Sequence, residues 1–198
     1  MITNKADIYK CKTDNGVSAL YIACQNGHTE IVNILIANKA DPNHCVTENG
    51  ASSLYIACSS GHTEIVKILI ANKANIVECP IVDRVTPLCM ACQNGYTEIV
   101  KILIANKADI ETCTTGFGSS PLLMTCQNGH TEIVNIRIAN KADIDKCTTD
   151  IGASPLLLAC KNGHTEIVNL LIANKVDIQL KICEFVISEL QNICFNTI

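Results

Sequence analysis

Residues 27–41 read GHTEIVNILIANKAD, and residues 129–143 read GHTEIVNIRIANKAD. The two stretches differ at a single position, where Arg137 stands in place of Leu35. Nearly the same text recurs around five glycines that are each 34 residues apart, namely Gly27, Gly61, Gly95, Gly129 and Gly163. Self-similarity at a fixed period of this length indicates an array of stacked structural units.

The period divides the chain into five full units and one partial unit. The full units cover about residues 12–45, 46–79, 80–113, 114–147 and 148–181. Residues 4–7 match residues 38–41, so the chain opens inside a truncated unit of about residues 1–11. No polar unit caps that end, which predicts either a fragment of a longer array or an N-terminal edge covered by something else. Apolar residues such as Phe185 and Leu190 predict that residues 182–198 form an amphipathic helix that closes the array.

Each unit predicts two short helices. A hydroxyl residue precedes proline at Thr86-Pro87, Ser120-Pro121 and Ser154-Pro155, which is typical of a helix N-cap followed by proline in the first turn. Ser18 and Ser52 keep the cap without the proline. This helix ends at the repeated glycine, and Thr29 and its copies are predicted to cap a second helix that ends near Asn38 and Lys39. The second helix is apolar at 31, 32, 34, 35 and 36, so we expect it to be sandwiched between neighbouring units.

Three short motifs resemble those of ankyrin repeats: TPL at residues 86–88, ACQNGH at 23–28 and EIV at 30–32. The resemblance covers about residues 4–181, and it implies an all-α solenoid of stacked helix–turn–helix units joined by hairpin-like turns. The chain departs from the family pattern where Tyr21 and its equivalents replace a histidine and where a cysteine replaces the second alanine. Lys39 and its copies also replace the glycine that ends the second helix. A lysine in left-handed conformation there destabilises each helix end by about 1 kcal/mol relative to glycine.

Thirteen cysteines are the unusual feature of the composition. Ten of them fall in two columns: Cys24, Cys58, Cys92, Cys126 and Cys160 on the first helix, and Cys11, Cys45, Cys79, Cys113 and Cys147 in the connector. Equivalent positions in stacked units lie about 8–10 Å apart, whereas a disulfide needs Cα atoms within about 7 Å. The first column is therefore predicted to pack as small buried hydrophobes, and the connector column stays open between a structural and a reactive role. Reduced thiols and a start without an apolar leader predict an intracellular, cytoplasmic protein.

Several classes of function are disfavoured by the sequence. A net charge of −4 and scarce aromatic residues disfavour nucleic-acid binding, and no apolar run approaches the roughly 18 residues of a membrane span. No motif of a known active site occurs, and carboxylates repeated along an array form no single site, so we expect no catalysis and no cofactor. Cys24 and His28 are four residues apart, but a glycine separates them and Tyr96 replaces the histidine in the third unit, which disfavours a metal site. The resemblance implies a structural role for His28 and its copies, and His44 is a lone surface candidate.

A partner is expected to contact positions at which the units differ. One set precedes the first helix: Asp14, Asn15, Val17, Glu48, Asn49, Asp83, Arg84, Phe117 and Ile151. A second set ends that helix: Gln25, Ser59, Gln93, Gln127 and Lys161. The ankyrin resemblance implies that both sets line a concave groove, with Phe117 and Ile151 as apolar anchors. The competing interpretation is neutral drift at unconstrained loop tips.

The resulting prediction is a non-catalytic protein–protein interaction module that is monomeric or part of a longer array. One alternative is a structural spacer within a larger ankyrin array, and a second is a thiol-based redox or metal-binding protein that uses the connector cysteines. Arg137 is interpreted as a drifted core position whose side chain reaches solvent at some cost in stability, and a locally loosened fourth unit is the alternative.

Overall fold

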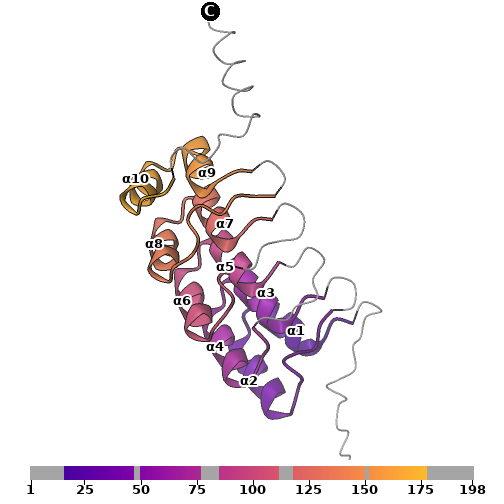
Figure 1. Cartoon of the computed structure of the whole chain (residues 1–198). Coiled ribbons are helices and arrows are strands. Elements are labelled where there is room, and N and C mark those ends of the chain that lie inside the picture. Colours follow the sequence, from indigo (N-terminus) through magenta and orange to yellow (C-terminus); the bar gives the residue numbers. More distant parts are fainter. Residues whose placement is uncertain (1–15, 47–49, 77–84, 112–117, 150–151, 178–198) are drawn as a thin grey trace, which may run out of the picture. The chain divides into compact units, whose positions relative to one another are not determined.

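The computed structural model describes residues 16–46, 50–76, 85–111, 118–149 and 152–177. These residues form ten helices in five consecutive pairs, which we call repeats one to five (Figure 1). The pairs are α1 (Ala19–Gln25) with α2 (Thr29–Ala37), α3 (Ser53–Ser60) with α4 (Thr63–Ala71), α5 (Pro87–Asn94) with α6 (Thr97–Ala105), α7 (Pro121–Asn128) with α8 (Thr131–Ala139), and α9 (Pro155–Lys161) with α10 (Thr165–Ala173). The described residues contain no strand beyond one isolated bridge, so the predicted all-α class is confirmed. None of these helices has the length and apolar character needed to cross a bilayer.

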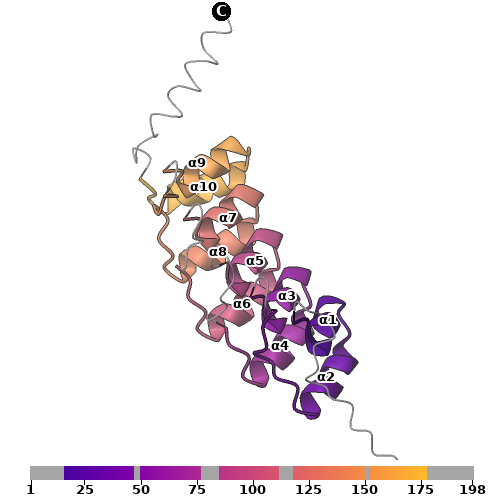
Figure 2. The ribbon, with the colours of Figure 1, turned by 90° about the vertical axis from the view of Figure 1, so that its right-hand side faces the viewer.

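The helix pairs belong to two compact units, residues 1–109 and residues 110–198. In the N-terminal unit, α3 packs between α1 and α5, and α4 packs between α2 and α6. In the C-terminal unit, α7 packs on α9 and α8 packs on α10. Within each unit the first helices therefore form one row and the second helices another (Figure 2). This arrangement confirms the prediction of stacked helix–turn–helix units.

The first helix of every repeat begins and ends as its sequence predicts. The hydroxyl oxygens of Ser18, Ser52, Thr86, Ser120 and Ser154 each accept a hydrogen bond from the backbone N–H three residues later, at 3.1–3.3 Å. Proline occupies the first turn of α5, α7 and α9. The helices end one or two residues before a glycine with positive φ, such as Gly61 at 79°. Caps are decided by a few neighbouring residues, which is why they can be predicted locally.

The start of the second helix differs from the prediction. The N-cap residue is His28 in α2 and its equivalent in each other repeat, and it makes no side-chain capping bond. Thr29 is already helical, so its predicted capping role is wrong. The reason is the turn itself, because Gly27 has a φ of 75° and its carbonyl accepts the Thr29 N–H at 3.0 Å. Only His28 then separates the glycine from the helix. Glu30 does lie in the first turn, where a negative charge favours the helix dipole.

The end of the second helix is closed by a lysine in left-handed conformation. In α2 the Lys39 N–H donates to the Ile36 carbonyl at 2.9 Å, and the Ala40 N–H donates to the Leu35 carbonyl at 3.0 Å. The same ending recurs in all five repeats, where Lys39, Lys73, Lys107, Lys141 and Lys175 have φ values of 64–69°. The predicted left-handed lysine is therefore confirmed, and each repeat carries a residue with a Cβ where glycine is favoured.

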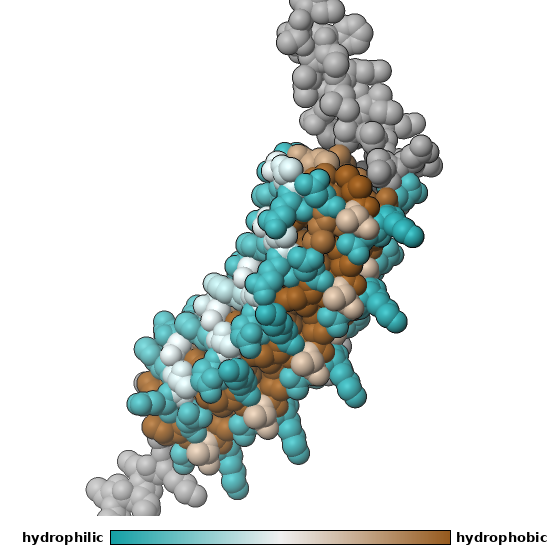
Figure 3. All heavy atoms as spheres, turned by 90° about the vertical axis from the view of Figure 1, so that its left-hand side faces the viewer, coloured by the Kyte–Doolittle hydropathy of each residue, from teal (hydrophilic) through white to brown (hydrophobic). Residues whose placement is uncertain are grey.

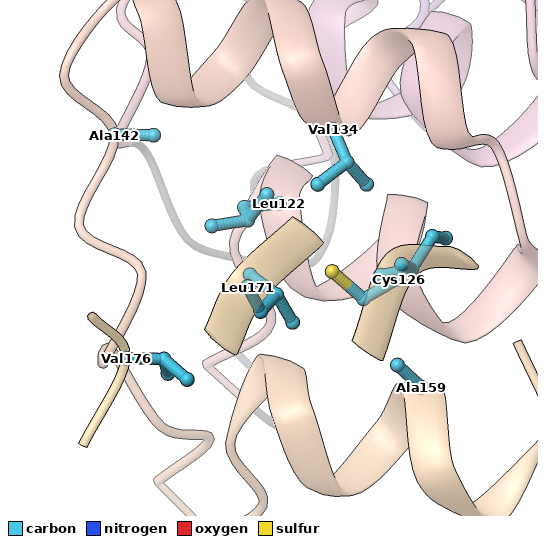
Figure 4. Packing of buried hydrophobic residues seen from close by; sticks show 8 residues of the cluster. Leu122, Cys126, Val134, Ala142, Ala159, Leu171 and Val176 are labelled. Atoms are coloured by element: carbon cyan, nitrogen blue, oxygen red, sulfur yellow. The ribbon is translucent and has the colours of Figure 1, made fainter. Parts of the chain in front are cut away.

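The core lies between consecutive repeats. In the C-terminal unit, Leu122, Cys126 and Val134 of the fourth repeat meet Ala159 and Leu171 of the fifth, with Ala142 and Val176 at the connector side (Figure 4). In the N-terminal unit, α4 buries Ile65, Val66 and Leu69, as expected for a helix with neighbours on two sides. Hydrophobic residues still show between hydrophilic ones on the side of the second helices (Figure 3). Part of the broad apolar stripe of the second helix is thus buried in the junctions between repeats, and the rest remains partly or fully exposed at the surface.

Arg137 is fully buried on α8, where other second helices bury a leucine such as Leu69 or Leu103. Its Nη2 donates a hydrogen bond to the backbone carbonyl of Ile110. The expectation that this side chain reaches solvent is therefore wrong. The position points into the core, and a carbonyl acceptor within the same unit holds the guanidinium there.

Two connectors form hairpin-like turns directly before the next first helix. The Val46 N–H donates to the Ala51 carbonyl at 3.0 Å, and the Thr148 N–H donates to the Ala153 carbonyl at 2.9 Å. The two pairs are equivalent in the 34-residue register. The chain therefore reverses direction before each of α3 and α9, as the predicted hairpin-like turns require.

Candidate protein-binding face

The second set of predicted contact residues lies at the ends of the first helices. Gln25, Gln93, Gln127 and Lys161 are exposed, and Ser59 is half-buried. Each is the last or the penultimate residue of its helix. In the N-terminal unit three of them lie on the contacting helices α1, α3 and α5, and in the C-terminal unit two lie on α7 and α9.

Most of the first set lies outside the described residues. Val17 is half-buried and directly precedes the Ser18 cap. The remaining members are Asp14, Asn15, Glu48, Asn49, Asp83, Arg84, Phe117 and Ile151, and all of them fall in the ranges that the structure does not describe. Their place in a groove stays a prediction.

An apolar row that sequence comparison missed lies beside the exposed helix ends. It consists of Ile22, Ile56 and Met90 in the N-terminal unit and of Met124 and Leu158 in the C-terminal unit. Ile22 is 44% exposed and the other four are half-buried. Residues three apart lie on the same side of a helix, so each row member neighbours one of the polar end residues, as Ile22 neighbours Gln25. We call these residues the helix-one face of each unit: Ile22, Gln25, Ile56, Ser59, Met90 and Gln93 in the N-terminal unit, and Met124, Gln127, Leu158 and Lys161 in the C-terminal unit.

The missed row could have been found from helical spacing. Leu20, Ala23 and Cys24 fill the buried side of α1, and at 100° per residue position 22 falls on the opposite side. The comparison between units passed over it because this position is apolar in every unit.

Hydrogen bonds between consecutive repeats fix the ends of the first helices. The Nε2 atom of His62 lies 3.1 Å from the Gln25 carbonyl, and that of His164 lies 3.1 Å from the Gln127 carbonyl. In the third repeat a tyrosine replaces the histidine, and Asn94 Nδ2 instead donates to the Ser59 carbonyl at 3.0 Å. The helix-one face is thus anchored through its backbone carbonyls, and its side chains are left to vary.

The same aromatic rings pack on the repeated glycines. A Cβ atom at Gly27 would lie 2.6 Å from the His62 ring, and one at Gly61 would lie 2.7 Å from the Tyr96 ring. Such distances are shorter than real Cβ contacts. Glycine is therefore favoured both by its positive φ and by the ring above it. The structural role that the resemblance implied for the histidine column is confirmed at His62 and His164.

His44 is also structural. Its ring is half-buried, and Nε2 lies 2.8 Å from the Gly16 carbonyl. The interpretation of His44 as a lone surface candidate is wrong, because the connector folds back on residues before α1. At the equivalent position of the fourth repeat, Lys146 Nζ donates to the Glu111 carbonyl at 3.0 Å and pairs with its carboxylate at 3.3 Å.

Polar residues of the connectors tie successive turns together in a similar way. Asn43 Oδ1 accepts the Asn75 N–H at 2.7 Å, and Asp145 Oδ1 accepts the Asp177 N–H at 2.9 Å. Both pairs span 32 residues and occupy the same register. These side chains act as caps for the next connector.

The first-helix cysteines are mostly buried packing residues. Cys24, Cys58, Cys92 and Cys126 are fully buried, which confirms their predicted role. Burial raises the pKa of Cys24 and of Cys126 to about 12, and it raises the pKa of Cys58 as well. Cys160 differs because it is exposed. Its equivalents Cys24, Cys58 and Cys126 lie on helices that pack against the following repeat of the same unit, and among the described residues no repeat follows α10.

The connector cysteines are partly open. Cys45 and Cys147 are half-buried, and their Sγ atoms lie 3.4 and 3.3 Å from the carbonyls of Asn43 and Asp145. Cys11, Cys79 and Cys113 lie outside the described residues. Within the residues that the structure describes, no group of three or more His, Cys, Asp or Glu side chains is arranged to hold a metal ion.

Comparison with known proteins identifies the architecture. The family model for ankyrin repeats in three copies matches residues 1–78 and 88–182. No curated protein matches the chain. The matched ranges contain nearly all of the ten helices. Ankyrin repeats generally act as protein–protein interaction modules, and the family is generally non-catalytic. The chain belongs to the ankyrin-repeat family.

Proposed function

We propose that the chain is a non-catalytic module that binds a protein partner through the helix-one face. The observation that carries the proposal is a contrast within each repeat. Backbone carbonyls at the ends of α1 and α3 are held by His62 and Asn94 of the next repeat, while the side chains at those ends differ and point to the surface. A framework that is constant beneath side chains that vary is the arrangement expected of a recognition surface.

The chemistry of this face suits a partner with both apolar and polar groups. Ile22, Ile56 and Met90 supply an apolar row in the N-terminal unit, and Gln25 and Gln93 border it with amide groups. Interfaces commonly combine an apolar centre with a polar rim. Methionine adds an adaptable contact surface.

Rigid presentation favours affinity. The first helices are only 7 or 8 residues long, and each is capped at its N-terminus and tied to its neighbours. Side chains on such a framework lose less conformational freedom on binding than side chains on a flexible loop. We further propose that the hairpin-tip residues, including Phe117 and Ile151, extend the same surface and form the concave groove.

The experiment compares two double variants of the N-terminal unit. Ile56→Glu with Met90→Glu places two charges on the helix-one face, and Ala71→Glu with Ala105→Glu places two charges on exposed positions at the ends of α4 and α6. Circular dichroism first establishes that both remain helical. Proteins captured from lysate by the wild type are identified and purified, and their affinities for all three forms are measured pairwise.

We expect the first variant to lose at least tenfold in affinity and the second to bind like the wild type. Equal binding by all three forms would contradict a role of the helix-one face and favour the spacer alternative. Loss in the α4 and α6 variant alone would move the interface to the second helices.

A further inference from the structure

Two different surfaces of a repeat meet at each junction within the two units. At the junction in the C-terminal unit, the fourth repeat contributes its trailing face and the fifth its leading face (Figure 4). The trailing face consists of Leu122, Cys126, Val134 and Ile138, and the leading face consists of Ala159, Ile167, Leu170 and Leu171. Both faces are apolar, and together they form one closed core.

The leading face of the first repeat is open. Ile167 is 0% exposed at its junction, and so is Ile99, whereas the equivalent Ile31 on α2 is 47% exposed. Ile34, which corresponds to Leu170, is 61% exposed. Burying apolar area of this kind is the main favourable term in protein association.

The trailing face of the fifth repeat is open as well. Cys126 and Val134 are 0% exposed, but their equivalents Cys160 and Val168 are exposed and half-buried. Ile172 is 46% exposed, while its equivalent Ile138 is half-buried against the core. The described part of the chain therefore presents one open face of each kind.

The two open faces match the closed junction residue for residue. Leu156, Cys160, Val168 and Ile172 repeat Leu122, Cys126, Val134 and Ile138, and Ala23, Ile31 and Leu35 repeat Ala159, Ile167 and Leu171. Of these, Ala23 is already buried, and Leu156 and Val168 also pack against the closed junction, so the open area lies mainly at Ile31, Ile34, Cys160 and Ile172. The one change, Ile34 for Leu170, conserves volume. A surface that fits its neighbour within the chain fits the same surface of another copy, because the same side chains interdigitate.

We propose that copies of this chain associate head to tail, with the trailing face of the fifth repeat in one copy on the leading face of the first repeat in the next. The contact joins two different patches, so it is heterologous and each added copy leaves one face of each kind open. The product is an open series whose length grows with concentration. This association does not use the helix-one face.

The first test is the molecular mass in solution, measured by analytical ultracentrifugation up to the solubility limit. The molecular mass of the wild type is expected to increase with concentration from the monomer value of 21.4 kDa. It should exceed the dimer mass without a plateau. Ile31→Glu is expected to remain monomeric. Ala37→Glu is the matched control, because Ala37 is exposed on the same helix and its equivalent Ala173 is not part of the junction cluster, and it should associate like the wild type.

The second test mixes two blocked copies. Ile31→Glu retains an intact trailing face, and Cys160→Glu retains an intact leading face. Each variant alone is expected to be monomeric, and an equimolar mixture is expected to form a dimer that grows no further. Both substitutions are at exposed positions, so the fold tolerates them.

Three results would overturn the proposal. A wild type that stays monomeric at every concentration would show that another segment, such as residues 182–198, occupies an open face. A plateau at the dimer would indicate a symmetric contact instead of an open series. A mixture of the two blocked variants that remains monomeric would show that the two faces do not pair.

Discussion

His62 packs its imidazole ring directly over Gly27 of the preceding repeat, and its Nε2 atom lies 3.1 Å from the carbonyl of Gln25. The glycine has a φ of 75°, so it ends α1 and provides the space for the ring at the same time. The repeated glycine of one unit and the histidine of the next therefore serve one junction.

Gly27→Ala is expected to destabilise the array more than Gly163→Ala does. Both glycines have positive φ, at 75° and 74°, so alanine is strained by about 1 kcal/mol at either site. At Gly27 the added Cβ also lies 2.6 Å from the His62 ring, whereas at Gly163 nothing lies within 4 Å. Urea unfolding should give about 1 kcal/mol for Gly163→Ala and roughly 2–3 kcal/mol for Gly27→Ala. Equal losses would mean that the ring moves aside without penalty.

Replacing a left-handed lysine with glycine is expected to stabilise the chain. Lys107 has a φ of 66° at the end of α6, where an L side chain is strained and glycine is not. Lys107→Gly should raise the free energy of unfolding by about 1 kcal/mol. Lys107→Ala removes the same charge and keeps the Cβ, so it separates the backbone effect from the electrostatic one. A gain in the alanine variant as large as in the glycine variant would contradict the backbone explanation.

Local features of the fold could be predicted because they are decided within a few residues. The Ser18 cap bonds a backbone N–H three residues away, and the left-handed lysine follows its helix directly. The Thr29 cap was predicted wrongly because the outcome depends on how tightly Gly27 turns the chain. The conformation of this turn is set by how α2 packs on α1. A pattern of residue types does not predict that packing.

The candidate site was predicted less completely for a related reason. The carbonyl bonded by Asn94 lies 35 residues earlier, and the one bonded by His44 lies 28 residues earlier. Neither hydrogen bond can be predicted from the spacing of residues in the sequence, because each forms only when parts of the chain that are distant in sequence pack together. Ile22 could have been found, since it lies opposite the buried side of α1. Variation between units does not reveal it, because this position is apolar in all five units.

Arg137→Leu is expected to raise the melting temperature. The guanidinium is fully buried on α8, and removing a charge from water is costly even when a carbonyl such as that of Ile110 accepts a hydrogen bond. Leucine fills the equivalent buried position in α4, α6 and α10. A gain of roughly 1–4 kcal/mol is expected, or about 2–4 °C per kcal/mol in calorimetry. Arg137→Ala serves as the control and should lower the melting temperature, because it leaves a cavity. An unchanged or lower melting temperature of the leucine variant would contradict the claim that the buried guanidinium destabilises the fold.

The thiols are expected to separate into two kinetic classes. Cys24, Cys58, Cys92 and Cys126 are fully buried, whereas Cys160 is exposed and the connector thiols of Cys45 and Cys147 are half-buried. At neutral pH a maleimide should label the second group rapidly and the first only after unfolding. Mass spectrometry of the digested protein identifies the labelled residues. Rapid labelling of a buried cysteine in the native protein would show that the junctions open readily.

Stability is expected to fall at alkaline pH through the same buried thiols. Burial raises the pKa of Cys24 and Cys126 to about 12, whereas a thiol in the unfolded chain titrates near pH 8.5. The folded state therefore retains protons that the unfolded state loses, so this contribution is fully present below about pH 8.5 and is lost as the pH rises toward 12. The slope reaches at most about 1.4 kcal/mol per thiol and pH unit. Urea midpoints of the wild type and of Cys24→Ala with Cys126→Ala, measured between pH 7 and about pH 10.5, should converge as the pH rises. Parallel curves would show that these thiols do not remain protonated in the folded protein.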